Sequence, residues 1–460
     1  MDQVGLLGPD EPRYASIGRH MAQSSDWITP RLWGEPWFEK PPLLYWMIGV
    51  AFRMGLSQDL APRLPNAVLG VAFLAFYYLL VRREFGSQSA FYSAGILAAS
   101  AGWLGFAHVG ATDLPLTATF SAAMFLVMAW LRTGERLLPA AAAISLALAV
   151  LAKGLVALAL ALPVLWFARR HFRQLLRPEA VLGFLITAVP WYALAAWRHG
   201  SVFWQEFFVR HHFQRFSSDA LQHQQPFWFY VPVLAAGLFP WCALLLLLRR
   251  LDYRDPRLQF LAAWVAWGLV FLSASLNKLP GYVLPLLPAL ALLCGLALAH
   301  SRRCAWTLGA SALLLGLLPL IAQVLPKAIQ AGLSRAEFSH LRWEWPAAAV
   351  ALAVTAMLLE WRRRRQAAFL LLLGALAASV TFLKTRAFPQ LDTLVSARAL
   401  WKQIEPHQAD CCVESLHRAY RYGLNYYSQV PLPDCISAPR PLHVIQDPGM
   451  APRVEAAPSP

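Results

Sequence analysis

The sequence predicts an all-α protein that crosses a membrane many times and ends in a small α/β tail. Of its 460 residues, 58% are hydrophobic and 14% are charged, whereas soluble domains carry about 25% charged residues. Apolar stretches recur along the chain, about twelve in all, and each is close to the length that crosses a bilayer as a helix. Arginine-rich loops lie between alternate stretches, which is typical of polytopic membrane proteins.

The apolar stretches define the expected membrane spans. The run from Ala140 to Trp166 is too long for one span, and Lys153-Gly154 in its middle predicts a turn between two helices. The expected spans cover residues 65–81, 87–107, 115–131, 137–152, 155–168, 180–197, 228–248, 258–275, 282–299, 304–325, 345–359 and 367–383.

Lysine and arginine in the short loops set the orientation, because cationic loops stay in the cytoplasm. With these spans the basic loops all fall on one side: Arg82 and Arg83, Arg132 and Arg136, Arg169 to Arg177, Arg249 to Arg257, Arg302 and Arg303, and Arg362 to Arg365. The opposite side then holds a first loop over residues 1–60 and a tail over 384–460, with the transmembrane domain over 61–383 between them.

The net charge of +15 does not indicate a nucleic-acid partner, because the basic residues are spread over cytoplasmic loops and form no contiguous stripe. Anionic membrane lipid is the more natural partner. In the outward-facing tail, an oxidising compartment permits one disulfide between Cys435 and either Cys411 or Cys412. No cysteine and histidine spacing typical of a structural zinc site is present.

Chemistry on the outer face has no soluble nucleotide to use, and the sequence contains no glycine-rich phosphate loop. A sugar linked to a lipid phosphate fits these conditions, because the phosphate leaves readily without a general acid. Such a site needs a carboxylate for the acceptor's proton and cations for the phosphate.

The first loop supplies candidates for both parts. Asp10 is the best candidate for the base, although an Asp just before a helix led by Pro12 and running through Ser24 commonly caps that helix instead. Lys40 follows Glu39 at a stiff double proline and is expected near the membrane interface, where it either binds the donor or snorkels toward the headgroups.

Further candidates lie at the outer ends of the spans. Asp113 either caps its helix or joins the first loop, and Lys153 is a lone cation between apolar runs, where ionisable groups are costly and usually functional. Arg215 is a candidate phosphate clamp, because a guanidinium binds phosphate oxygens in a bidentate fork. Tyr282 opens a proline-broken span, as an interfacial anchor or as part of the site.

These motifs together resemble the bacterial lipid A aminoarabinose transferases and their protein O-mannosyltransferase-like relatives, which are membrane glycosyltransferases of the GT-C architecture. The resemblance extends from Asp10 to about Pro389 and rests on Asp10-Glu11-Pro12-Arg13-Tyr14-Ala15, Phe38-Glu39-Lys40-Pro41-Pro42-Leu43-Leu44-Tyr45-Trp46, Ala61-Pro62-Arg63-Leu64-Pro65, Lys153-Gly154, His211-His212 to Arg215, and Lys278 to Pro288. The resemblance implies a bacterial inner-membrane domain of thirteen helices whose site faces the periplasm. The first of these thirteen helices is expected before Asp10 and is absent from this sequence. The product is therefore expected to be truncated.

The resemblance also implies roles for single residues and a reaction. Asp10 would be the catalytic carboxylate and Asp113 the second acid, while the donor's phosphate and sugar would be held by Arg13, Tyr14, Glu39, Lys40, Lys153, Arg215 and Tyr282. No cofactor is required by this scheme, but a divalent metal is possible, with Glu39 as a ligand. The sugar would leave a polyprenyl phosphate with inversion and pass to lipid A, a protein or another envelope glycan.

The sequence of the periplasmic tail predicts a small α/β unit, and no role for this unit can be inferred from the sequence. Its expected elements are a helix over 391–402, a strand over 411–415, a helix over 418–427 and a strand over 442–445. As a different class of function, a transporter or flippase of lipid-linked sugars would also be polytopic and basic inside. Transporters, however, place ionisable groups near the bilayer midplane within repeats, and the sequence shows no internal repeat.

Overall fold

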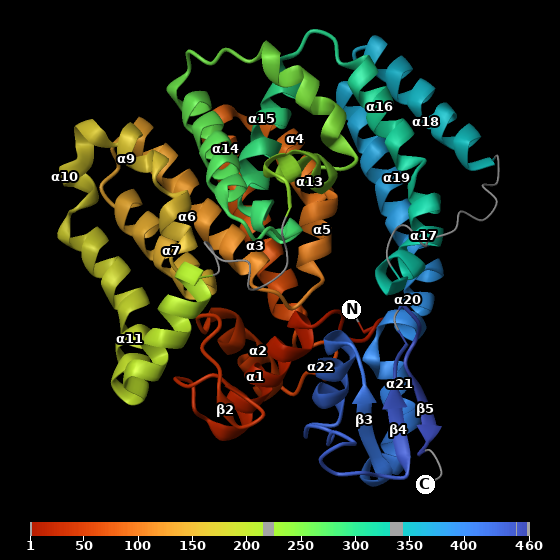
Figure 1. Ribbon diagram of the computed structural model, residues 1–460. Coiled ribbons are helices and arrows are strands. Elements are labelled where there is room, and N and C mark those ends of the chain that lie inside the picture. The colour runs from red at the N-terminus through yellow and green to blue at the C-terminus, as the bar shows by residue number, and fades with distance from the viewer. Residues whose placement is uncertain (1, 215–224, 332–343, 448, 458–460) are drawn as a thin grey trace.

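The computed structural model describes residues 2–214, 225–331, 344–447 and 449–457 (Figure 1). The first loop contains α1 Asp10–Ser24, β1 Arg31–Leu32, β2 Glu35–Pro36 and α2 Leu43–Arg53. The first half of the bundle contains α3 Leu64–Phe85, α4 Ser87–Ala98, α5 Ala101–Ala107, α6 Asp113–Thr133, α7 Leu138–Lys153, α8 Val156–Leu160, α9 Pro163–Phe167, η1 Arg169–His171, α10 Phe172–Leu175, α11 Pro178–Phe203 and η2 Trp204–Gln214.

The second half of the bundle contains η3 Phe227–Phe229, α13 Tyr230–Gly237, η4 Trp241–Arg250, α14 Pro256–Ala274, η5 Pro280–Leu286, α15 Leu287–His300, α16 Ala305–Leu315, α17 Leu318–Ala331, α18 Glu344–Trp361 and α19 Arg365–Arg386. The C-terminal domain contains α20 Phe388–Val395, α21 Ala397–Ile404, η7 Glu405–Asp410, β3 Cys411–Ser415, α22 Arg418–Tyr427, β4 Leu442–Ile445 and β5 Arg453–Ala456.

Among the described residues, 6 helices are long and apolar enough to cross a membrane, and the number rises to 9 if each of 3 bent helix pairs counts as one span. These nine coincide with nine of the expected spans. The other three expected spans are helical as well, in α7, the broken pair α8 and α9, and α18. The turn expected at Lys153-Gly154 is confirmed, because α7 ends at Lys153 and Gly154 adopts a positive φ of 82°.

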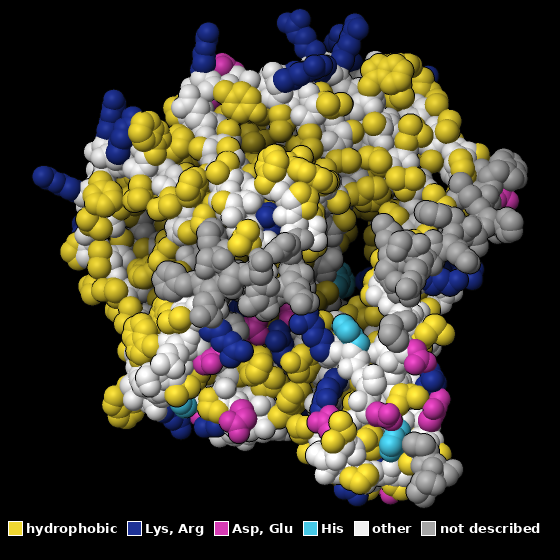
Figure 2. Space-filling view, in the orientation of Figure 1, with side chains coloured by type: hydrophobic (Ala, Val, Ile, Leu, Met, Phe, Trp, Pro, Cys, Tyr) yellow, Lys and Arg dark blue, Asp and Glu magenta, His cyan; other side chains and the backbone are white. Residues whose placement is uncertain are grey.

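Two helices form the centre of the bundle. The apolar windows of α6 and of the η5–α15 segment are 83% and 89% buried, whereas those of the other long straight spans are 22–33% buried against protein and present most of their surface outward. The outward surface of the bundle is covered by apolar side chains (Figure 2). The α6 helix and the η5–α15 segment are therefore the most buried of the long spans among the described residues.

The two ends of the bundle differ in character. Lysine and arginine side chains project from the end that lies far from the first loop, while the first loop and the C-terminal domain lie together at the opposite end (Figures 1 and 2). This arrangement agrees with the separation of basic loops from the first loop that the sequence predicts.

Helix α1 begins two residues earlier than expected and ends at Ser24 as predicted. Its first residue is Asp10, and Pro12 occupies the first turn, where its missing N–H has no partner to lose. The helix packs closely on α2, because a Cβ on Gly18 would come within 2.5 Å of Ile48. A larger residue at position 18 would separate the two helices.

The C-terminal domain is a three-stranded sheet of order β3–β4–β5, in which β3 and β4 are parallel and β5 is antiparallel to β4. The expected bounds of β3, α22 and β4 are confirmed. The single helix expected over 391–402 is wrong, because the chain breaks at the extended residue Ser396 into α20 and α21. The predicted disulfide is confirmed and joins Cys412 to Cys435, which leaves Cys411 as a buried thiol.

The C-terminal domain is anchored on the first loop by ionic and polar contacts. Arg398 lies between Asp59 and Asp392, with Nη1 and Nη2 each 2.8 Å from one carboxylate oxygen. The Tyr427 hydroxyl donates to Asp59 at 2.7 Å and accepts from the backbone N–H of Leu6 at 3.0 Å. The domain and the first loop therefore form one body at this end of the molecule.

A buried ion pair joins the first loop to the bundle. Glu11 is 1% exposed and accepts from Arg63 through both oxygens, at 2.7 Å each. The same carboxylate accepts from the backbone N–H groups of Leu7 and Gly110, and Arg63 also donates to the carbonyls of residues 4 and 5. Every charge in this network is therefore compensated.

Removing one partner of this pair should destabilise the fold strongly. We expect Arg63→Met to lower the free energy of unfolding by about 3–5 kcal/mol, because the buried Glu11 carboxylate loses its countercharge. The exposed pair of Arg136 and Glu179 offers a control, since Arg136→Met should cost about 1 kcal/mol or less. Thermal unfolding of both purified variants in detergent measures the difference. Equal shifts for the two variants would contradict the assignment.

Candidate active site

Four charged side chains meet where α1 faces the loop before α2. Arg13 pairs with Asp10 and, through Nη1 at 2.9 Å, with Glu39. Lys40 Nζ lies 2.9 Å from the other Glu39 oxygen. The Glu39 and Lys40 side chains are only 8% and 10% exposed, whereas that of Asp10 is 50% exposed. Asp10 is therefore the member of this cluster that a substrate reaches most easily.

The alternatives left open by the sequence are decided by these contacts. Asp10 is the first residue of α1, and its carboxylate pairs with Arg13 of the same helix. Lys40 is buried against Glu39 and does not extend toward headgroups. Both residues therefore take part in a charged cluster.

The cluster holds Arg13 as a permanent cation. Burial by itself would lower the pKa of the Arg13 guanidinium, but Glu39, Tyr14 and Asp10 outweigh burial and keep that pKa above its usual value. Burial also raises the pKa of Tyr14 well above its usual value, and the nearby Asp10 and Glu39 carboxylates add to the rise. Tyr14 is therefore a neutral phenol and cannot act as a base at physiological pH.

A second cluster lies at the outer end of the central helices. Lys153, the last residue of α7, places Nζ 2.6 Å from Asp113 Oδ1 and 4.7 Å from the centre of the Tyr282 ring. Asp113 is the first residue of α6. Gly281 makes this approach possible, because a Cβ there would lie 2.6 Å from Asp113. The three predicted residues are thus brought together.

The two clusters lie on either side of the Glu11 network. Glu11 follows Asp10 in α1, and its Oε1 accepts from the backbone N–H of Gly110 at 2.9 Å, three residues before Asp113. Asn66 fixes the same loop by donating to the carbonyls of Val109 and Ala111 at 2.7 and 2.9 Å. The positions of Asp10 and Asp113 are therefore coupled through one buried set of hydrogen bonds.

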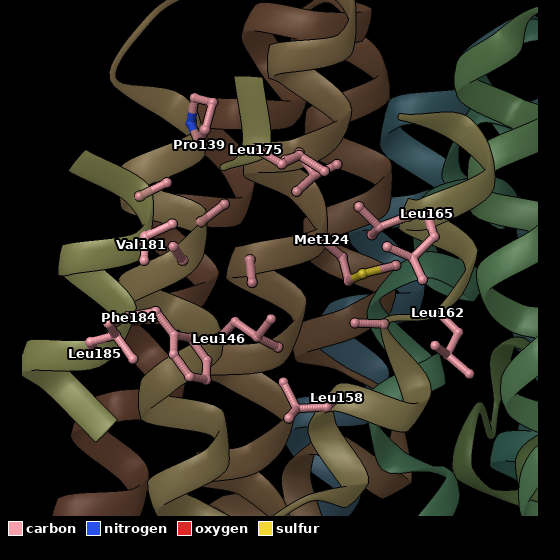
Figure 3. A pocket seen from close by; sticks show the side chains of 17 residues that line it. Met124, Pro139, Leu146, Leu158, Leu162, Leu165, Leu175, Val181, Phe184 and Leu185 are labelled. Carbon is pink, nitrogen blue, oxygen red and sulfur yellow. The ribbon is translucent and has the colours of Figure 1, made fainter. Parts of the chain in front are cut away.

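An apolar cavity of about 370 Å³ opens between α6, α7 and α11 and the short helices after Lys153 (Figure 3). Leu146 and Leu158, which flank Lys153 in the sequence, line it on one side, and Met124 and Phe184 contribute from α6 and α11. The cavity has room for a hydrocarbon chain. It lies within the same helices that carry the second charged cluster.

Arg215 and His223 lie outside the described residues, and the side chains of His211 and His212 are likewise not described. Lys278 is 5% exposed, and its Nζ donates to the carbonyls of Ser275 at 2.5 Å and Gln225 at 3.0 Å. In the described part of the chain, Lys278 therefore ties two segments together at the outer side.

Comparison with known proteins identifies the family. Residues 39–197 match the family model described as dolichyl-phosphate-mannose-protein mannosyltransferase. The undecaprenyl phosphate-alpha-4-amino-4-deoxy-L-arabinose arabinosyl transferase of Pseudomonas aeruginosa is 36% identical over 315 residues, 65% of this chain and 57% of that protein. The protein of the same name from Serratia proteamaculans is 32% identical over 361 residues, 74% of this chain and 64% of that protein. The chain thus spans less than two thirds of the length of these relatives.

The fold extends the likeness over nearly the whole chain. The crystal structure of ArnT from Cupriavidus metallidurans bound to undecaprenyl phosphate superposes with a TM-score of 0.77 at 25% identity, covering 96% of this chain and 90% of that one. The chain belongs to the GT-C membrane glycosyltransferases of the aminoarabinose transferase type. The recognition made from the sequence motifs is confirmed.

A divalent metal at Glu39 does not fit the described residues of this GT-C protein. Both Glu39 oxygens already face cations, one from Arg13 and one from Lys40. Within the described ranges, the group with metal-ligand geometry is Cys412, Cys435 and His443, in which the two cysteines form the disulfide. No step of the chemistry below is therefore derived through a metal.

For three residues that contribute to this GT-C site, the sequence predicted no role. Arg63 and Glu11 stand in the motifs that support the resemblance, but their pairing joins residues 52 positions apart and leaves no local pattern. Tyr422 comes from the C-terminal domain and lies 5.5 Å from the Arg13 guanidinium. The sequence of the helix that carries Tyr422 is amphipathic, and this pattern does not indicate that the helix contacts the first loop.

Proposed function

We propose that the chain transfers a sugar from a polyprenyl-phosphate-linked donor to an envelope acceptor on the periplasmic face of the bacterial inner membrane. The observation that carries the proposal is the presence of two charged clusters, one with a half-exposed Asp10 beside Arg13 and one with Lys153 held between Asp113 and the Tyr282 ring. An acid that meets an acceptor and a cation that meets a phosphate are the two parts that such a transfer needs.

In this scheme the phosphate of the donor meets Lys153. Lys153 stabilises the charge that develops on the departing phosphate, assisted by Lys40 and, from outside the described residues, Arg215. Asp113 orients Lys153 through their 2.6 Å contact, and Tyr282 offers its ring face to the same ammonium.

Asp10 acts on the acceptor. Its carboxylate takes the proton of an acceptor hydroxyl, whose oxygen attacks the anomeric carbon from the face opposite the phosphate, so the configuration inverts. If the acceptor oxygen belongs to a phosphate, little deprotonation is needed and Asp10 positions the acceptor instead. Arg13 and Glu39 then hold Asp10 and the sugar hydroxyls in place.

The named relatives support undecaprenyl phosphate as the carrier and 4-amino-4-deoxy-L-arabinose as the sugar. We propose lipid A as the first acceptor to test, with proteins and other envelope glycans as the alternatives. The transporter interpretation is disfavoured, because Asp113 is the first residue of α6 and Lys153 the last residue of α7, so that this charged cluster lies at helix ends rather than at the middle of the spans.

A transfer assay in membranes tests this proposal. Undecaprenyl phosphate carrying radiolabelled aminoarabinose is supplied to membranes that contain the full chain, and label is followed into lipid A and into protein separately. We expect label in an acceptor fraction. Movement of the donor across sealed vesicles without any labelled acceptor would instead establish a flippase and reject the transferase.

A further inference from the structure

Three aromatic rings surround the guanidinium of Arg13. Its central carbon lies 5.6 Å from the centre of the Tyr14 ring, 5.7 Å from Trp37 and 5.5 Å from Tyr422. Tyr14 belongs to α1 and Trp37 to the loop after β2, but Tyr422 belongs to α22 of the C-terminal domain. A segment about four hundred residues away in sequence therefore completes the surroundings of an active-site arginine.

The rings decide where the guanidinium points. Arg13 uses its terminal nitrogens for Asp10 and Glu39, while its Nε is buried and has no hydrogen-bond partner among the described residues. Hydrogen bonds therefore hold only the outer end of the group. The orientation of its plane depends on the faces of the neighbouring rings, to which a guanidinium is attracted.

Tyr422 is itself held in a defined place. Its ring stacks on Trp33 with centroids 5.4 Å apart and an interplanar angle of 29°. Trp33 sits at the tip of the β1–β2 hairpin with a φ of 52°, a conformation that side chains other than glycine rarely adopt. A two-residue hairpin turn favours a positive φ at this position, and the stack on Tyr422 holds the Trp33 side chain.

The helix that carries Tyr422 is docked on α1. Arg19 of α1 lies 4.4 Å from the centre of the Tyr426 ring and donates to the Tyr426 carbonyl at 2.6 Å. The Tyr426 hydroxyl donates to the carbonyl of Gln58 at 2.6 Å. These contacts fix α22 one helical turn beyond Tyr422, so its ring keeps a constant place beside Arg13.

We propose that Tyr422 is a positioning residue and that the C-terminal domain thereby forms part of the active site. The Tyr422 ring holds the Arg13 guanidinium between Asp10 and Glu39, which leaves Asp10 oriented toward the acceptor. This inference rests on the proposed function and adds the role of the tail, for which the sequence offered none.

The test compares two replacements of Tyr422 in the full chain. Tyr422→Leu removes the ring face, and we expect kcat for sugar transfer to fall about tenfold with the KM for the donor nearly unchanged, because a lost desolvated cation–π contact is of that size. Tyr422→Phe keeps the face and should recover most of that kcat. An equal loss in both variants, or no loss in Tyr422→Leu, would overturn the proposal.

Arg421→Gln is the matched control, because Arg421 precedes Tyr422 on α22 and pairs only at the surface, with Asp434. Arg421→Gln should leave kcat unchanged. If it lowers kcat as much as Tyr422→Leu does, the loss in both variants comes from weaker docking of the C-terminal domain and not from the Tyr422 ring. A thermal double-mutant cycle of Tyr422→Leu with Arg13→Gln needs no catalysis. Non-additive shifts in Tm support the contact, and additive shifts refute it even if no sugar transfer is found.

Discussion

Asp10→Asn should lower the rate of sugar transfer about 10²–10⁴-fold, the range that a positioned general base supplies. The amide keeps the shape of the side chain but cannot take a proton, and it weakens the ion pair with Arg13. The rate is measured with labelled donor in membranes that contain equal amounts of each variant. A phosphate acceptor would place the loss near the lower end of this range, because that acceptor needs little deprotonation.

Asp26→Asn provides the control for this experiment. Asp26 lies in the same outer loop as Asp10. Its carboxylate accepts from the backbone N–H groups of Ile28 and Thr29 and pairs with Arg198, so in these contacts it shares no partner with the two charged clusters. We expect its transfer rate to stay within about twofold of the original, since surface pairs contribute little. A fully active Asp10→Asn variant would remove Asp10 from the mechanism.

Lys153→Met should reduce kcat about 10²–10³-fold, the loss seen when one preorganised group that stabilises developing charge is removed. Methionine fills a similar volume but carries no charge for the departing phosphate, and it leaves Asp113 without its partner. Steady-state rates with labelled donor measure the effect. Lys153→Arg should recover only part of the rate, because a planar guanidinium cannot occupy the ammonium's place between Asp113 and the Tyr282 ring.

Lys384→Met is the comparison for position 153. Lys384 also lies near the outer end of a span, in α19, and its Nζ is 3.4 Å from His108 Nε2. Its replacement removes one interfacial cation and should leave kcat nearly unchanged. If both lysine variants lose the same activity, a general effect of interfacial charge would replace the specific role of Lys153.

Much of the local structure could be predicted from the residues alone. Hydrophobic run length placed the spans, because a bilayer accepts only apolar segments of sufficient length. The lysine and glycine at 153 and 154 predicted a break that α7 confirms. Short apolar runs in the tail located β3 and β4, but the mostly exposed β5 has Val454 as its one partly buried residue and was missed.

The start of α1 and the roles of its acids could not be read in the same way. An Asp before Pro12 carries the pattern of a helix cap, but Asp10 lies inside α1 and pairs with Arg13 one turn later. Asp113 likewise stands where a cap is expected and pairs instead with Lys153, forty residues away. Local propensity is weaker than a charge-assisted contact in a partly buried site.

Composition, run length and loop charge determined that this chain is a polytopic helical membrane protein, and its motifs determined the family, because these properties depend on neighbours in the sequence. Only the tertiary structure decided that Asp10, Arg13 and Glu39 meet, that Lys153 lies beside Asp113 and Tyr282, and that Tyr422 reaches Arg13. Apart from the pair of Asp10 and Arg13, which lie one helical turn apart, these contacts join residues that are 26 to about four hundred positions apart. Their geometry is set by packing of α1, α6 and α22, which no local pattern of residues records.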